Sequence, residues 1–256
     1  MKNKFTILGC GSSHGVPTIM NYWGASDNLN KKNRRTRCSA FFTLNGISIL
    51  IDTSPDIRSQ FISNGIKKLD AVLYSHEHSD QTSGIFELRP FAWKKKEKIN
   101  IFGSTKTIKE LIRRYDFCFK KKSSYVPILR SNIVKKKFSI IISRKKIDIS
   151  TFEVLHGKTT STVYIVNKVA YISDCSFISE KQLMKLKNLN YLIIDCFRNK
   201  FFPTHLNYKS ALRIAKILKP KKTILTNLHL DLDYETIKKK LPSNIVPAFD
   251  GMSFNF

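Results

Sequence analysis

The sequence predicts one α/β domain built around two β-sheets, and three observations lead to this fold class. Short apolar, β-branched runs recur along the 256 residues with brief polar breaks, a pattern typical of buried strands. Segments with an apolar residue every three or four positions alternate with these runs, as in amphipathic helices. No repeat, low-complexity segment or Ser/Gly-rich linker divides the chain. Residues 1–256 are therefore expected to form a single domain.

The individual elements follow from the same patterns, taken in chain order. A first series of strands is predicted over 5–8, 40–44, 47–51, 71–74 and 99–102. A second series is predicted over 138–142, 152–155, 163–166, 169–172, 191–194 and 223–225. Helical periodicity covers 55–63, 105–115, 179–186, 208–218 and 234–241. We expect Ser104 and Asn207 to be N-caps, Pro220 to end the fourth helix, and Asn167-Lys168 to form a tight hairpin.

Composition excludes two classes of protein. Hydrophobic residues make up 42% of the chain, enough apolar surface to offset the entropy of folding, so the chain is not intrinsically disordered. No apolar run approaches the roughly 20 residues of a membrane-spanning helix, so we expect no membrane association. The five cysteines form no C-x-x-C pair and leave one thiol over in any disulfide scheme, which favours a reducing, cytoplasmic location.

The net charge of +26 has two interpretations. Lys and Arg bind nucleic acids by neutralising phosphates, so a polyanion partner is one of them. Alternatively, a Lys-rich composition follows from AT-rich coding, and Lys runs in separate polar stretches are typical of solvated surface. We favour the second interpretation and regard nucleic acid as a possible partner only. In either case the positive field attracts an anionic substrate.

The clearest chemical motif is an H-x-H-x-D pattern formed by His76, His78 and Asp80. At this composition it would occur by chance only about 0.006 times. The motif directly follows the predicted strand 71–74, and loops at strand ends commonly carry function. Two imidazoles at alternate positions can converge on one cation, and a carboxylate adds a hard oxygen ligand. The motif therefore predicts a metal site.

Two further residues stand at the ends of predicted strands. His156 follows the strand 152–155, and Asp174 follows the strand that begins at residue 169. We expect His156 to be a third imidazole ligand on the same rim as the first cluster. The Asp174 carboxylate is able to bridge two cations or to hold a water between them.

Several motifs together resemble the metallo-β-lactamase superfamily, most nearly the branch of phosphoribosyl 1,2-cyclic phosphate phosphodiesterase. They are spread in order from residue 6 to residue 252: Ile7-Leu8-Gly9-Cys10-Gly11-Ser12-Ser13, Gly15-Val16-Pro17, Ile51-Asp52-Thr53-Ser54-Pro55-Asp56, the H-x-H-x-D loop, Leu155-His156-Gly157, Ser173-Asp174 and Asp250-Gly251-Met252. The resemblance implies an αββα sandwich of two mixed β-sheets flanked by helices. It also implies hydrolysis of phosphodiesters at a centre of divalent transition metals, Zn or Mn.

The resemblance also implies roles for individual residues. The first metal's ligands would be His76, His78 and His156, with Asp174 as the bridging carboxylate. Asp80 would be a ligand of the second metal and, with His205, part of the catalytic machinery. His205 matches a histidine that protonates the departing alcohol, a task that suits an imidazole. Arg37, Arg89 and Arg198 lie beside motif segments and are candidates for holding phosphate oxygens, although ordinary surface Arg is the commoner case.

The chain departs from the family pattern at two positions of the second metal site. Gln81 and Asn227 stand where histidines are common, and amide oxygens are poorer ligands than imidazole for zinc-like ions. One or two ions per chain are therefore possible, and His229 is a candidate replacement ligand. We favour two ions, because Asp80 and Asp174 would otherwise crowd beside one cation, and expect the second to bind weakly and to prefer Mn²⁺. No structural zinc is expected, since Ser26 lies where some relatives carry a cysteine cluster.

The expected function is that of a metal-dependent phosphodiesterase acting on a small cyclic or nucleotide-like phosphodiester through a metal-activated hydroxide. Three alternatives stay open. One is a ribonuclease of the same superfamily, although no inserted RNA-clamping arm is recognisable. Another is a thioester or lactone hydrolase with the same metals, and the third is a non-catalytic nucleotide binder with an eroded second site. The sequence carries no signal for an oligomeric state.

Overall fold

Two mixed sheets of seven strands each form the centre of the molecule in the computed structural model, which describes residues 3–121 and 125–256. The first sheet contains, in spatial order, β14 (Ser253–Asn255), β1 (Lys4–Gly9), β2 (Ser39–Leu44), β3 (Ile47–Ile51), β4 (Ala71–Leu73), β5 (Ile99–Gly103) and β6 (Leu129–Ile133). From β14 to β3 neighbouring strands are antiparallel, and from β3 to β6 they are parallel.

The second sheet contains, in spatial order, β13 (Ile245–Pro247), β12 (Lys222–Thr226), β11 (Tyr191–Asp195), β10 (Val169–Ile172), β9 (Thr159–Val166), β8 (Lys145–His156) and β7 (Lys137–Ile142). From β10 to β13 the strands are parallel, and from β7 to β10 they are antiparallel. Because β8 and β10 are both antiparallel to β9, β8 ends at the same edge of the sheet as β10, β11 and β12.

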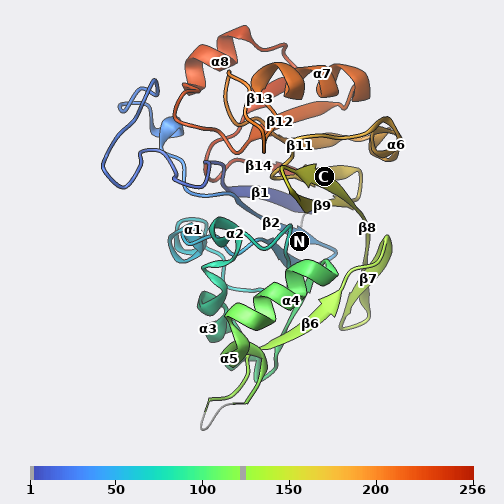
Figure 1. Ribbon diagram of the computed structural model, residues 1–256. Helices are drawn as coiled ribbons and strands as arrows, with labels where there is room; N and C mark the ends of the chain where they lie inside the picture. The colour runs from blue at the N-terminus through green and yellow to red at the C-terminus, as the bar shows by residue number, and fades with distance from the viewer. Residues whose placement is uncertain (1–2, 122–124) are drawn as a thin grey trace.

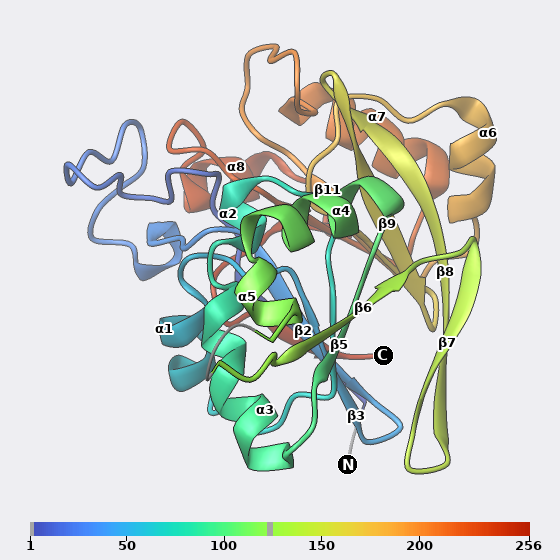
Figure 2. The same cartoon turned by 60° about the horizontal axis from the view of Figure 1, so that its bottom comes forward.

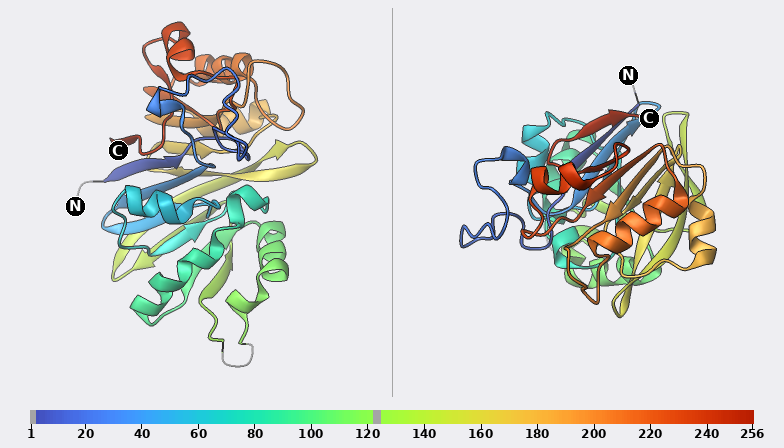
Figure 3. Two further views of the ribbon diagram at one scale, coloured as in Figure 1. Left: turned by 90° about the vertical axis from the view of Figure 1, so that its left-hand side faces the viewer. Right: turned by 90° about the horizontal axis from the view of Figure 1, so that it is seen from above.

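Helices cover the outer face of each sheet (Figures 1 and 3). Those beside the first sheet are α1 (Ile57–Ser63), α2 (Ser79–Thr82), α3 (Arg89–Lys95), α4 (Thr105–Arg114) and α5 (Asp116–Phe119). Those beside the second sheet are α6 (Glu180–Leu183), α7 (Tyr208–Leu218) and α8 (Tyr234–Lys240). Short 3₁₀ turns add η1 (Lys31–Asn33), η2 (Ile85–Leu88) and η3 (Met184–Leu186). The order helix, sheet, sheet, helix confirms the predicted αββα sandwich.

Three apolar clusters hold these layers together. The central cluster lies between the sheets and includes Phe5 and Phe42 from one and Tyr164 and Tyr171 from the other. The rings of Phe5 and Tyr171 lie 6.3 Å apart across the interface, within the range of favourable aromatic contacts. The second cluster packs α7 and α8 on the second sheet, and the third packs α1 and α4 on the first. Each sheet is therefore buried on both faces, which is why its strands read as nearly continuous apolar runs.

The local predictions can now be compared with the structure. Asn167 and Lys168 have φ of 44° and 63° and join antiparallel β9 and β10, which confirms the tight hairpin. Ser104 and Asn207 each accept a backbone N–H at the start of α4 and α7, as predicted, and α7 ends before Pro220. The predicted helix over 179–186 is divided into α6 and η3. The prediction missed the short strands β6, β13 and β14, the short helices α2, α3 and α5, and the 3₁₀ turns η1 and η2.

A long connection joins β1 to β2 over residues 10–38 and projects beyond the edge of the first sheet (Figure 2). Its inner part is fixed by Arg35, whose buried guanidinium donates to the carbonyl oxygens of His229 and Leu232 at 3.3 and 2.7 Å. The same group donates to Asn33 Oδ1 at 2.8 Å. Arg35 therefore ties this connection to the loop that follows β12 in the second sheet.

The structure also shows the state of the cysteines and the lengths of the helices, on which two expectations from composition depended. All five cysteines are buried free thiols. The longest α-helix in the described ranges is α7 with 11 residues, and none there has the length and apolarity that a membrane crossing requires.

Candidate metal centre

The ends of three strands bring the predicted donors together from both sheets. His76 and His78 follow β4 in the first sheet, while His156 ends β8 in the second. Asp174 follows β10 at the same edge of the second sheet. The structure thus unites residues that lie up to about 100 positions apart, and four of the six histidines gather here with Asp174. The grouping follows from the strand directions, because these strands all end at this edge.

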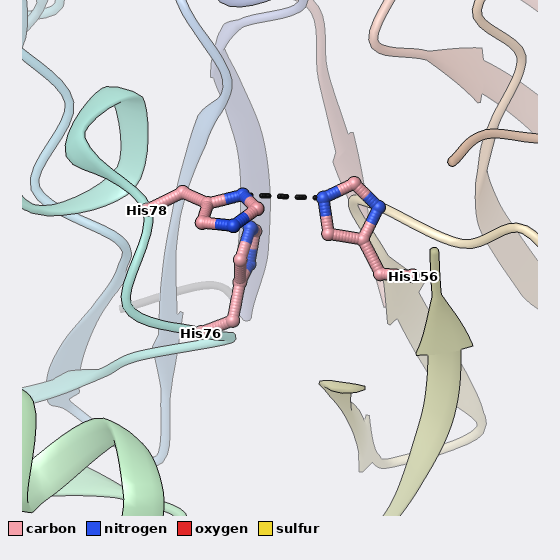
Figure 4. A group of neighbouring side chains, drawn as sticks. All are labelled: His76, His78 and His156. Carbon is pink, nitrogen blue, oxygen red and sulfur yellow. Dashed lines mark hydrogen bonds between the residues drawn. The ribbon is translucent and has the colours of Figure 1, made fainter. Parts of the chain in front are cut away.

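Three imidazoles form the centre of the cluster (Figure 4). The nitrogen ligand atoms of His76, His78 and His156 lie within 4.8 Å of one another. His78 Nδ1 and His156 Nε2 face each other at 3.2 Å. His76 and His156 are buried, whereas His78 is exposed and opens the cluster to solvent. Three converging nitrogens match the ligand set of a catalytic zinc-type site.

Neighbouring groups set the tautomer of His76. Ser75 Oγ donates to Asp52 Oδ2 at 2.7 Å and so has its lone pairs free for the N–H at His76 Nδ1, 3.0 Å away. The proton on Nδ1 leaves Nε2 with a lone pair. His76 Nε2 is buried and has no hydrogen-bond partner among the described residues. A buried nitrogen lone pair that has no donor and lies beside two other imidazoles fits the role of a metal ligand.

A corresponding contact orients His156. Its Nδ1 donates to the carbonyl oxygen of Thr204 at 2.6 Å, so Nε2 carries the lone pair that faces His78. The close approach of this loop depends on Gly157, where a Cβ would lie 2.6 Å from the Thr204 side chain. Gly157 also has φ of +60°, a conformation that favours glycine. A hydrogen bond on the far nitrogen is the usual way in which proteins aim a metal-binding imidazole.

The pKa values of His76 and His78 keep these two imidazoles unprotonated. Burial is the main cause that lowers the pKa of His76 to about 3; Asp174 opposes it, and the neighbouring His156 and His78 act in the same direction as burial. Burial and the neighbouring His156 also lower the pKa of His78. Metal binding requires neutral imidazoles, so no proton has to leave His76 at neutral pH. The donor set therefore fits a divalent transition metal.

The loop that carries the first two histidines is anchored to α4. Arg114 donates to the carbonyl oxygen of Glu77 at 2.7 Å. Lys106 Nζ lies 2.7 Å from Glu77 Oε1, and the same oxygen accepts a hydrogen bond from Thr159 at 3.1 Å. Burial alone would raise the pKa of Glu77, but the bonds from Lys106 outweigh it and lower the pKa. Glu77 thus ties the loop that carries His76 and His78 to α4 and to β9 of the second sheet.

Two carboxylates and two amides lie beside the imidazoles. Asp174 Oδ1 is 4.0 Å from His156 Nε2 and accepts a hydrogen bond from Asn227 Nδ2 at 3.2 Å. Asp174 Oδ2 accepts from Gln81 Nε2 at 3.3 Å, and Asp80 Oδ2 accepts from the same nitrogen at 3.1 Å. Asp80 therefore lies next to Asp174, as the sequence predicted, with Gln81 between them.

The two carboxyl groups differ in their electrostatics. Burial, and after it the charge of Asp174, raise the pKa of Asp80 to about 6. Burial would also raise the pKa of Asp174, but the surrounding His76, His205 and His156 outweigh it and lower the pKa. Both groups are therefore carboxylates at neutral pH, and Asp174 keeps its charge to a lower pH than Asp80 does.

His205 lies on the other side of Asp174 and is paired with a residue that the sequence analysis missed. Its Nδ1 is 2.9 Å from Asp195 Oδ2 and 3.7 Å from Asp174 Oδ1. Asp195 is fully buried at the end of β11 and also accepts the N–H of Cys175 at 2.9 Å. A lone acidic residue closing the apolar run 191–194 was the signal that could have revealed it. The ring of His205 stacks on Phe197 at 4.6 Å.

The pairing sets the charge of His205. Burial lowers the pKa of an imidazole, but the carboxylates of Asp195 and Asp174 outweigh it and raise the pKa of His205 to about 9. Burial raises the pKa of the Asp195 carboxyl, while His205 and the Cys175 N–H act against it. The donors around Asp195 favour its carboxylate, so His205 holds a proton at neutral pH.

The structure does not bring His229 into either group of ligand atoms in the described part of the chain. Its Nδ1 accepts the N–H of Asp231 at 3.3 Å and lies 3.3 Å from Asp231 Oδ2. The backbone explains this placement, because the N–H groups of Leu228 and His229 donate to the carbonyls of Cys10 and Phe197. His229 is therefore engaged with Asp231 and joins no ligand group in the described ranges, so the structure gives the expected replacement no support.

The three candidate arginines have other partners. Arg37 Nε lies 3.0 Å from Asp56, and Arg198 pairs with Asp231. The guanidinium of Arg89 lies over the rings of Phe86 and Trp93. None of these contacts directs an arginine at the imidazole cluster.

Comparison with known proteins adds to this geometry. Residues 48–227 match the family described as Beta-lactamase superfamily domain. A curated relative named "Octanoyltransferase", from Porphyromonas gingivalis, is 27% identical over 251 residues, which are 96% of this chain and 50% of the relative. The chain thus spans about half the length of that relative.

Solved structures extend the comparison to the whole chain. A structure described as a new diphosphatase from the PhnP family is 30% identical, with a TM-score of 0.89 over 100% of this chain and 98% of that one. Zn²⁺-bound PqqB from Methylobacterium extorquens is 15% identical, with a TM-score of 0.72 over 99% and 100% of the two chains. The family match covers well over half of the chain, and the two-sheet sandwich with histidine and aspartate donors at one edge agrees with it. The chain belongs to the metallo-β-lactamase superfamily of hydrolases.

Proposed function

We propose that the protein is a metal-dependent phosphodiesterase that acts on a small cyclic or nucleotide-like phosphodiester. One observation carries this proposal: the buried His76 Nε2 has no hydrogen-bond partner among the described residues and lies beside the imidazoles of His78 and His156, and His156 in turn lies beside Asp174 and the protonated His205. A cation site on one side of Asp174 would activate water, and the acid His205 on the other side would protonate the leaving oxygen. This arrangement suits the hydrolysis of an ester with a poor leaving group.

His76, His78, His156 and Asp174 would hold the cation. When bound, a divalent zinc or manganese ion lowers the pKa of a bound water towards about 7 and polarises a phosphoryl oxygen. His156 and His76 present their lone pairs through the hydrogen bonds to Thr204 and Ser75. The exposed His78 marks the side from which substrate enters.

His205 would give its proton to the leaving oxygen. Since Nδ1 is engaged with Asp195, Nε2 is the nitrogen that transfers the proton. Asp195 acts through His205 as a positioning residue that fixes the tautomer and keeps the ring charged. A diester is thereby converted into a monoester and an alcohol.

Two features support a small anionic substrate. The net charge of +26 attracts anions to the whole surface, including the region around the cluster. The similar structure at 30% identity is described as a diphosphatase from the PhnP family, and a diphosphatase cleaves a phosphoanhydride bond of an anionic substrate. That description also favours a second candidate function, hydrolysis of a diphosphate bond, in which the leaving group is a phosphate and needs less help from an acid.

A substrate panel tests the proposal. Metal-depleted protein, reloaded with Zn²⁺ or Mn²⁺, would be incubated with a cyclic phosphodiester, a linear nucleotide diester, a dinucleoside diphosphate, an RNA oligomer and an octanoyl thioester. The thioester belongs in the panel because of the name of the curated relative. We expect metal-dependent release of a monoester from the small diesters, loss of that activity in His76→Ala, and retention in the matched control His229→Ala. Cleavage of the thioester or RNA alone would contradict the proposal.

A further inference from the structure

The Gln81 side chain joins the two carboxylates of the centre. Its Nε2 donates to Asp80 Oδ2 at 3.1 Å and to Asp174 Oδ2 at 3.3 Å. An amide nitrogen carries two hydrogens and both partners accept only, so Nε2 rather than Oε1 faces the carboxylates. Gln81 is 1% exposed, so water does not compete for these contacts.

A second amide completes the arrangement on Asp174. Asn227 is 2% exposed and donates from Nδ2 to Asp174 Oδ1 at 3.2 Å and to the carbonyl oxygen of Ser173 at 3.4 Å. Asn227 follows β12 with φ of +59°, a left-handed conformation that asparagine tolerates better than most residues. Each oxygen of Asp174 therefore accepts one amide N–H.

We infer that the Gln81 carboxamide takes the place of a second cation, so that the centre binds one divalent ion, held by His76, His78, His156 and Asp174. The inference rests on the metal centre of the proposed function and specifies its stoichiometry. It replaces the expectation of two ions, which assumed that the neighbouring carboxylates needed a cation between them. The hydrogens of Nε2 supply positive charge at that point instead.

The donors around Asp80 support the same conclusion. A second cation there would need further lone pairs, but Gln81 and Asn227 direct N–H groups at the carboxylates. His229, which could have replaced them, is engaged with Asp231. Gln81 Oε1 is left buried without a donor among the described residues, a cost that two hydrogen bonds to carboxylates outweigh.

The arrangement also divides the tasks of Asp174. Oδ1 lies on the side of the His156 imidazole, whereas Oδ2 is directed at Gln81. Oδ1 accepts one N–H from Asn227 and has a second lone pair with which to join the imidazoles as a ligand, while Oδ2 keeps Asp80 in place through the shared Gln81 amide. Gln81 is thus a positioning residue for both carboxylates.

Metal stoichiometry provides the test. Metal-depleted wild-type protein, Gln81→His, Asn227→His and the double variant would be titrated with Mn²⁺ and with Zn²⁺ by calorimetry, and the bound metal measured by elemental analysis. Electron paramagnetic resonance of the Mn²⁺ samples separates an isolated ion from an exchange-coupled pair. His229→Ala is the matched control, and thermal melts establish that each variant is folded.

We expect one equivalent and an isolated-ion spectrum for the wild type and for His229→Ala, and two equivalents with a coupled spectrum for the double variant. Two equivalents in the wild type would overturn the inference and leave the proposed function standing. One equivalent in a folded double variant would overturn the role given to the two amides. A wild type that binds no ion would overturn the metal centre of the proposed function and the inference with it.

Discussion

His205 Nδ1 lies 2.9 Å from Asp195 Oδ2, and this ion pair is formed by a buried carboxylate at the end of one strand and an imidazole ten residues further along the chain. Asp195 is fully buried, whereas His205 keeps 12% of its side chain exposed. The pair therefore joins a carboxylate inside the protein to an imidazole that is partly accessible to solvent. Three of the predictions that follow depend on it or on residues around it.

Replacing His205 by Ala should slow the hydrolysis of diesters with alkoxide leaving groups about 100-fold or more, the usual contribution of a general acid. Diesters with an activated aryl leaving group should lose much less, because such a group departs without a proton. Steady-state rates on the two substrate types measure the difference. Equal losses on both would remove His205 from the acid role.

The pH dependence of activity should also reflect the role of His205 as the acid. Because the pKa of His205 is raised to about 9, its acid form persists at neutral pH and the rate should fall as the pH rises through about 9. Asp195→Asn removes the carboxylate and should move this alkaline limb towards about 6.5, the usual imidazole value. An unchanged limb in a folded Asp195→Asn protein would show that another group titrates there.

The free energy of unfolding should decrease with rising pH because of His205. An imidazole whose pKa is raised on folding stabilises the protein fully below about pH 6.5 and loses that contribution as the pH rises through about 9. Denaturant unfolding of the wild type at several pH values measures the decline, and His205→Ala should flatten it. A decline of the same size in both proteins would assign the effect to other groups.

His229→Ala should leave metal stoichiometry unchanged and turnover within about a factor of two, since the imidazole pairs with Asp231 rather than with the cluster. By contrast, weakening a true metal contact commonly costs about tenfold or more in affinity or activity. Elemental analysis beside diesterase assays checks this. A halved metal content would place His229 among the ligands.

Removing metal should lower thermal stability, because an ion that binds only the folded chain stabilises it by mass action. At a free concentration 100 times the dissociation constant this amounts to about 2.7 kcal/mol, or several degrees in the melting temperature. His76→Ala should melt at the same temperature with and without Zn²⁺. A wild-type melting temperature that chelation does not change would argue against a site at His76.

Much of the fold and part of the site could be predicted from the sequence, for reasons visible in particular residues. Each sheet is buried on both faces, so its strands are almost unbroken apolar runs, and a single donor after such a run lies at the sheet edge. His76, His78, His156 and Asp174 were found in this way, and the structure brings them together. Short elements such as β14, whose residues are exposed or half-exposed, contain no such apolar run and so give no signal in the sequence.

The remainder of the site depends on contacts that no local pattern contains. The sequence shows that Gln81 and Asn227 are amides but not that both direct their N–H groups at Asp174. The placement of His229 is decided by backbone bonds to Cys10 and Phe197, which are distant in sequence. Asp195 was missed because an acidic residue at the end of the apolar run 191–194 indicates a buried acid but not its pairing with His205.

The clustered donors come from both sheets, with His76 and His78 on one side and His156 and Asp174 on the other. Neither half alone carries the three imidazoles, so the cluster exists only after the two sheets have docked through Phe5 and Tyr171. Contacts between such distant segments form late in folding, because a long stretch of chain must first be closed. A nascent chain therefore cannot assemble the three imidazoles while its second half is still being made, and an ion bound by all three would indicate that the two sheets have docked.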